Sequence, residues 1–131
     1  MQRQVIEVPV VSDAIRRLGA PTSALVRAGG LLFTCGMPPL DLRTGDIVIG
    51  DITVQTHAAL NALDAALTFG GSSLADVVKA TVFVTDPALM GGVNVVYRER
   101  FPNGFPARTS AAIKPWPLTF DIEIECVATL R

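Results

Sequence analysis

The sequence has few of the residues that build metal sites and hydrolase triads. It contains one histidine, His57, and two cysteines, Cys35 and Cys126, in 131 residues. Because no cluster of Cys, His or carboxylates has ligand spacing, we expect no zinc or iron site and no metal. A Ser-His-Asp triad would need His57, which we expect in solvent on the polar face of a helix. Two cysteines are too few for a disulfide framework, and we expect both to be buried free thiols.

Charge is also scarce, and it is not concentrated in one place. Eleven Lys and Arg residues stand against 12 Asp and Glu, giving a net charge of -1. The basic residues are scattered, so we expect no nucleic-acid partner. No window reaches the roughly 18 apolar residues of a membrane helix, and no apolar leader is recognisable, so we expect no membrane partner and a cytoplasmic protein. No Walker loop or G-x-G-x-x-G follows a strand, so we expect no cofactor.

The length and the apolar content suggest one domain that contacts other subunits. A chain of 131 residues can bury one substantial core, so we expect a single domain over residues 1–131. Half of the residues are apolar and only 18% are charged, which is rich in apolar residues for a small monomer. Part of the apolar surface is therefore expected to meet another subunit.

The apolar pattern predicts an α+β fold with the order β-β-β-α-β-α-β-β. Two helices would cover one face of a mixed sheet, and trimerisation would cover the other. A Gly29-Gly30 turn predicts that the second and third strands form a hairpin. The predicted strands are Val5–Val10, Ser23–Arg27, Leu31–Cys35, Val77–Thr85, Arg108–Ile113 and Ile122–Leu130, and the helices are Ile52–Phe69 and Met90–Phe101.

Arg108 and an array of three carboxylates are the polar groups that need an explanation. Asp121, Glu123 and Glu125 alternate along a strand and should face one way. One interpretation makes this array the solvent face of an edge strand, with Arg108 as its cross-strand ion-pair partner. Composition alone favours that interpretation. The other interpretation makes these residues a site.

Four segments resemble the Rid family, also called YjgF, of enamine and imine deaminases. They occur in the family's order, and the 14 residues between Arg108 and Glu123 also match its spacing. Several matched segments are more specific than one motif, so the resemblance favours a site. The segments are GSSLADVVKATVFVTD (71–86), VNVVYRERF (93–101), FPARTSAAI (105–113) and DIEIECVA (121–128).

The resemblance implies a fold, an assembly and an activity. The fold would be chorismate-mutase-like, and a homotrimer would hold three sites in clefts between subunits. The arginine at Arg108 would bind the carboxylate of a small imine or enamine substrate, and the glutamate at Glu123 would order the attacking water. Backbone groups around Cys35 and Ser110 would lie nearby. The reaction would convert 2-imino or enamino acids to 2-oxo acids and ammonia without a cofactor.

Two departures from the family pattern leave alternatives open. The family's Gly-Pro-Tyr is Ala20-Pro21-Thr22 here, so Thr22 replaces a pocket tyrosine, and its Ser-Gly-Gln is Cys35-Gly36-Met37. Both changes suggest an altered substrate preference or a weak general deaminase. Two roles stay open, protection against reactive imines and service in one catabolic pathway, such as an aminomuconate-like step. A non-catalytic ligand-binding or regulatory trimer is the main alternative. An endoribonuclease is a third, against which a single exposed histidine and the lack of a basic patch both argue.

Overall fold

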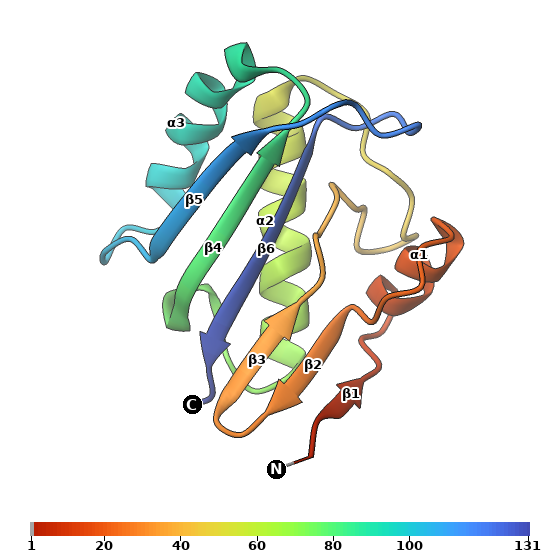
Figure 1. Cartoon of the computed structure of the whole chain (residues 1–131), viewed down its shortest axis with the longest axis vertical. Coiled ribbons are helices and arrows are strands. Elements are labelled where there is room, and N and C mark those ends of the chain that lie inside the picture. Colours follow the sequence, from red (N-terminus) through yellow and green to blue (C-terminus); the bar gives the residue numbers. More distant parts are fainter. Residues whose placement is uncertain (1) are drawn as a thin grey trace.

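One six-stranded mixed sheet organises the chain. The computed structural model describes residues 2–131 and orders the strands β1-β2-β3-β6-β4-β5 (Figure 1). Neighbours are antiparallel except β4 and β5, which are parallel and are joined by a helical crossover, as parallel neighbours require. The predicted α+β class is confirmed. The strands are β1 (Gln4–Ile6), β2 (Leu25–Ala28), β3 (Leu31–Thr34), β4 (Val77–Val84), β5 (Ala107–Ala112) and β6 (Ile122–Thr129).

Two helices cover one face of this sheet. Helices α2 (Ile52–Phe69) and α3 (Met90–Arg100) lie behind the sheet in Figure 1. Alternate residues of β6, such as Ile122 and Ile124, are 0% and 1% exposed and form the core on this side. The face turned toward the viewer in Figure 1 carries no helix of the described residues 2–131. Its covering by other subunits stays a prediction.

A third helix, α1 (Val11–Arg17), occupies a position where the prediction of the first strand was wrong. The strand ends at Ile6 instead of Val10. The apolar residues that follow have helical spacing, and Val11, Ala14 and Ile15 are buried. The hydroxyl of Ser12 accepts a 2.8 Å hydrogen bond from the backbone N–H of Val8, which fixes the turn into the helix.

The predicted Gly29-Gly30 turn is confirmed, and helix α2 is capped at both ends. Ala28 pairs with Leu31 across Gly29-Gly30, and Gly29 has a φ of 61° that glycine adopts without steric cost. Asp51 caps α2, because its Oδ1 accepts a 2.9 Å hydrogen bond from the N–H of Val54. Gly71, with a φ of 93°, ends the same helix.

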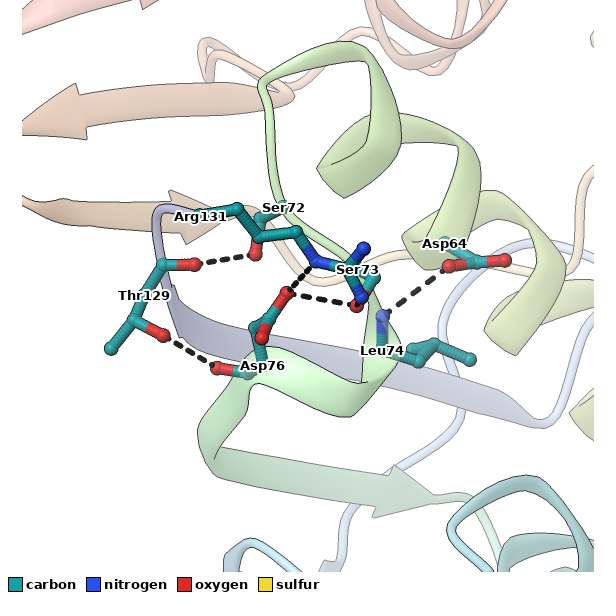
Figure 2. A network of polar contacts seen from close by, with 7 residues as sticks. All are labelled: Asp64, Ser72, Ser73, Leu74, Asp76, Thr129 and Arg131. Atoms are coloured by element: carbon teal, nitrogen blue, oxygen red, sulfur yellow. Dashed lines mark hydrogen bonds and ion pairs between the residues drawn. The ribbon is translucent and has the colours of Figure 1, made fainter. Parts of the chain in front are cut away.

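Strand β6 lies in the interior of the sheet, between β3 and β4. The edge-strand interpretation of its carboxylates is therefore wrong. Polar contacts also fix Thr129 at its end, and Arg131 beyond it, to the turn before β4 (Figure 2). Ser72 Oγ donates a 2.6 Å hydrogen bond to the carbonyl of Thr129, and Arg131 Nε lies 2.7 Å from Oδ2 of Asp76. Strand β6 is thus a rigid support for the side chains that it carries.

Candidate active site

Arg108 lies on the helix-covered side of the edge strand β5, opposite buried Ala80 of β4. Its Nε donates a 2.8 Å hydrogen bond to Oγ of Ser110, and its Nη2 donates a 2.8 Å hydrogen bond to Oδ1 of Asn94 on α3. Its Cζ also lies 4.5 Å from the centroid of the Tyr97 ring, a cation–π geometry. These contacts hold the guanidinium in one orientation.

No carboxylate neutralises Arg108 among the described residues 2–131. The predicted cross-strand ion pair is therefore wrong. The guanidinium lies at a hollow of about 220 Å³, which we call the Arg108 hollow and which Asn94, Tyr97, Arg98, Phe105 and Pro106 also line. Burial lowers the pKa of Arg108, but an arginine stays protonated at neutral pH. The hollow therefore presents an uncompensated positive charge.

Glu123 points from β6 into a second hollow, of about 630 Å³, on the open face of the sheet. We call it the Glu123 hollow, and Thr22, Cys35 and Gly36 also line it. The backbones of Met37 and Ile124 exchange hydrogen bonds of 2.8 and 3.1 Å, which brings residues 35–36 beside Glu123. A Cβ on Gly36 would overlap Oε1 of Glu123, so any larger residue at this position would displace the carboxylate.

The surroundings of Glu123 change its acidity. Burial raises its pKa to about 7, and the nearby charge of Glu125 adds to the effect. A carboxylate with a pKa near neutrality is a suitable proton acceptor at physiological pH. Burial raises the pKa of Cys35 to about 11, with Glu123 as the next cause, so Cys35 stays a thiol there. Cys126 is buried, as predicted, whereas Cys35 is only half-buried.

The predicted array of three carboxylates is wrong at Asp121. Its Oδ2 accepts a 3.1 Å hydrogen bond from Gln55 of α2, and its Oδ1 accepts a 2.9 Å hydrogen bond from Thr85. Asp121 therefore joins the sheet to the helix. Glu125 is exposed and lines the Glu123 hollow, where its Oε2 accepts a 3.2 Å hydrogen bond from Thr81. Two carboxylates remain at this hollow.

The structure also shows the surroundings of three other residues that the sequence analysis discussed. Thr22 does line the Glu123 hollow and is exposed. Met37 is fully buried, so its replacement of a polar amide does not change the lining. The prediction that His57 lies in solvent is wrong, because His57 is half-buried, with its Nδ1 3.3 Å from Nη1 of Arg100 on α3.

Arg108 and Glu123 are separated within one chain. Across β4, Arg108 lies opposite Ala80, which pairs with Cys126, three positions from Glu123. Two strand spacings and three residues of rise put their Cα atoms on the order of 14 Å apart. The two side chains also lie on opposite faces of the sheet. The predicted site residues therefore form two groups, one with Arg108 and Ser110 and the other with Glu123, Cys35 and Thr22.

Comparisons with known proteins agree with this fold. The family model described as endoribonuclease L-PSP matches residues 14–130. A solved structure from Yersinia pestis, described as a protein of unknown function of the conserved Rid protein family, is 32% identical with a TM-score of 0.88, over 98% of this chain and all of the other. The chain belongs to the Rid family.

Curated relatives support the Rid assignment over almost the whole chain. A RutC family protein of Pyrococcus horikoshii is 39% identical over 122 residues, which are 93% of this chain and 96% of the relative. The chloroplastic Reactive Intermediate Deaminase A of Arabidopsis thaliana is 36% identical over 124 residues, which are 95% of this chain and 66% of the relative. The resemblance found in the sequence is thus confirmed.

Three residues of this Rid chain that touch the hollows were missed by the sequence reasoning. Asn94 is a polar residue beside Met90 and Val93 on the apolar face of α3. Its position there was the available signal for a role at Arg108. Tyr97 has the helical spacing of a core residue, and that spacing alone does not indicate its contact with Arg108. Trp116, between two prolines, lies in a segment without periodicity, so no local pattern indicates its place in the Glu123 hollow.

The remaining expectations for this Rid chain concern metal and location. Among residues 2–131, no group of three or more His, Cys, Asp or Glu side chains is arranged to hold a metal ion. No helix in the same range is long and apolar enough to cross a membrane. Similar proteins include a chloroplastic one from Arabidopsis thaliana and a mitochondrial one from Schizosaccharomyces pombe. The cytoplasmic location stays a prediction.

Proposed function

We propose that this protein hydrolyses 2-imino acids and their enamine tautomers to 2-oxo acids and ammonia. The observation that carries the proposal is a pair of ionisable side chains, one at each hollow, that have no oppositely charged partner among residues 2–131. Arg108 is half-buried and has no carboxylate partner in residues 2–131, and burial raises the pKa of Glu123 to about 7. The name of the Arabidopsis relative, Reactive Intermediate Deaminase A, supports the same reaction class.

Arg108 would bind the substrate carboxylate. A guanidinium has five N–H donors, and two of its nitrogens are engaged here, Nε with Ser110 and Nη2 with Asn94. Both N–H groups of Nη1 are free of acceptors within residues 2–131 and can meet a carboxylate oxygen. A charge-assisted contact of this kind contributes about 1.5 to 3 kcal/mol, or roughly 10- to 150-fold in affinity.

Glu123 would accept a proton from the attacking water. The water oxygen forms a bond to C2 of the protonated imine while its proton passes to the carboxylate of Glu123. The resulting carbinolamine takes this proton on nitrogen and its C–N bond breaks to release ammonia. Glu123, again a carboxylate, accepts the hydroxyl proton as the C=O of the 2-oxo acid forms. The iminium carbon is already electrophilic, so positioning and proton transfer suffice and no cofactor is needed.

The site would be shared between subunits. C2 of a 2-imino acid is bonded directly to the carboxylate carbon, so both catalytic groups must reach neighbouring atoms. The sheet separates Arg108 from Glu123 within one chain. We therefore propose that Arg108 of one copy meets Glu123 of the next in a homotrimer, whose subunits also cover the open sheet face.

The activity is tested with imines made in situ by an amino-acid oxidase, in the presence of semicarbazide to trap the remaining imine. We expect the wild-type protein to suppress semicarbazone formation. Glu123→Gln should lower kcat by roughly 100-fold or more, and Arg108→Ala should raise KM by roughly 10- to 150-fold. Equal rates for the three proteins would contradict the proposal. Arg108-dependent binding of 2-oxo acids without turnover would indicate the regulatory alternative.

The shared site is tested by mixing the two inactive variants. In a cyclic trimer, every mixed assembly of Arg108→Ala and Glu123→Gln chains contains one junction with both intact groups. Random exchange of equal amounts should therefore restore roughly a quarter of the wild-type sites. Chains refolded separately and then combined without exchange are the control. No recovery after verified exchange would place both groups in one subunit's site, and a monomer in light scattering would remove the shared site.

The family model's description, endoribonuclease L-PSP, names a different activity. The geometry around the single histidine does not favour it, because His57 contacts Arg100 between two helices. An RNA-cleaving activity that persists through repeated purification and disappears with His57→Ala would support that alternative.

A further inference from the structure

The Glu123 hollow has mostly apolar walls. Ile15 of α1 and Leu18, which follows that helix, contribute to them, together with residues 116–118 of the segment between β5 and β6. Its volume of about 630 Å³ lies within the range that accommodates small organic ligands. An apolar side chain of a ligand is therefore more stable in this hollow than in bulk water.

Trp116 is the largest of these apolar side chains, and it is held in place. Its ring lies 5.0 Å from the ring of Phe120, centroid to centroid, at an interplanar angle of 39°. Phe120 is only 2% exposed, so it anchors Trp116 to the core. A ring that is fixed before binding loses little conformational entropy when a ligand packs against it.

The charges at this hollow are all negative. Its lining, drawn from residues 2–131, contains no Lys, Arg or His, and its two ionisable carboxyls are Glu123 and Glu125. Besides the indole N–H of Trp116, the polar side chains that remain in this lining are Thr22 and Cys35. An anionic substituent would be repelled here, and a strongly polar one would lose hydrogen bonds to water without replacement.

The proposed reaction determines which part of a substrate enters this hollow. Water bound to Glu123 must reach C2, so C2 lies at the mouth of the hollow. The side chain of a 2-imino acid branches from C2. It therefore extends toward the apolar walls, while the carboxylate points away toward Arg108 of the neighbouring copy.

We propose that Trp116 selects imines and enamines whose side chain is large and apolar, above all aromatic. This inference rests on the proposed function, because it assigns the side-chain class of the same substrate. Aromatic contact and the accompanying apolar burial should favour a phenylalanine-derived imine over an alanine-derived one by roughly 10-fold in kcat/KM. Imines with a second carboxylate, of the aminomuconate-like kind, should be disfavoured.

The experiment compares imines derived from phenylalanine, alanine, glutamate and arginine, each made in situ by an oxidase that accepts the parent amino acid. The variants are Trp116→Ala and Trp116→Leu, of which the second keeps apolar bulk in case the first folds poorly. Phe69→Leu is the matched control, because Phe69 is an exposed aromatic at the end of α2 and does not line the hollow. The measured quantity is the ratio of kcat/KM between the phenylalanine and alanine imines.

We expect both Trp116 variants to lower this ratio by roughly 5- to 10-fold, and Phe69→Leu to leave it unchanged. A ratio that both Trp116 variants preserve would overturn the inference, as would a wild-type preference for the glutamate or arginine imine. Turnover of the alanine imine tests the proposed function separately. If no imine is hydrolysed, calorimetry tests the selection instead. The wild-type protein should bind 3-phenylpropanoate roughly 10-fold more tightly than propanoate, and the Trp116 variants should lose this difference. Equal affinities in the wild-type protein would overturn the selection.

Discussion

Nη2 of Arg108 donates a 2.8 Å hydrogen bond to Oδ1 of Asn94, which ties the edge strand β5 to helix α3. Because this bond orients the guanidinium, Asn94→Ala should raise KM for carboxylate-bearing substrates by roughly 10-fold and change kcat less. Asn94→Asp should impair binding more strongly, because its carboxylate would neutralise Arg108. Steady-state kinetics measure both effects. Asn103→Ala, at an exposed loop position, is the control, and an unaltered KM in Asn94→Ala would remove the orienting role.

The raised pKa of Glu123 predicts how activity and stability change with pH. If its carboxylate accepts the proton, log kcat/KM should rise with pH through about 7, and this limb should be absent in Glu123→Gln. Ionisation is costly in the folded state, so stability is lost as pH rises from the ordinary value of 4.5 through about 7. The melting temperature of Glu123→Gln relative to wild type should therefore be higher at about pH 8 than at about pH 5. A constant difference across this range would contradict the shift.

Glu125 provides a second test of the same electrostatics. Its negative charge is the second cause, after burial, of the raised pKa of Glu123. Glu125→Gln should therefore move the midpoint of the activity limb to lower pH without removing the limb. Asp64→Asn, a change of equal charge on α2 outside this hollow, should leave the midpoint in place. A midpoint that responds equally to both variants would indicate a change in general surface charge instead.

Gly36 should be required for activity more than for stability. A Cβ there would overlap Oε1 of Glu123, the far end of a flexible side chain that can rotate away. Gly36→Ala should thus lower kcat by roughly 10-fold or more while the melting temperature changes little. Gly30→Ala is the control, because no atom lies within 4 Å of its added Cβ. Wild-type kcat in Gly36→Ala would show that the position of this carboxylate is not critical.

Two adjacent glycines of α3 should respond differently to alanine. A Cβ on Gly91 has no heavy atom within 4 Å, so Gly91→Ala should stabilise the protein by about 0.5 to 1 kcal/mol through lower entropy of the unfolded chain. A Cβ on Gly92 would lie 2.6 Å from Cγ2 of Ile52, so Gly92→Ala should be the less stable of the two. Denaturant unfolding measures the difference, and the reverse order would contradict it.

The elements that the sequence predicted correctly carry local signals. Gly29-Gly30 permits the tight hairpin, and Asp51 supplies the cap of a long amphipathic helix. Helix α1 was missed because valines around Pro9 are typical of a strand, although Val8, Val11 and Ile15 have helical spacing. Burial against the core decides between strand and helix in this segment, and the local sequence pattern does not show that burial.

The site was predictable where family motifs lie on regular strands, and less so elsewhere. Arg108 and Glu123 were identified from the resemblance to the Rid motifs, and both lie at hollows. Asp121 appeared to belong with Glu123 because strand residues alternate. Its hydrogen bonds with Gln55, 66 residues away in sequence, turn it toward α2, and no local pattern reveals such a partner.

Trp116 is the only tryptophan in the sequence, and it lines the hollow that holds Glu123. All of the protein's tryptophan fluorescence therefore originates at the wall of the candidate active site. Ligand entry changes the polarity around this ring, so emission wavelength and intensity report occupancy without an added label. The same signal follows binding in stopped-flow mixing, which separates the arrival of a ligand from the chemical step that follows.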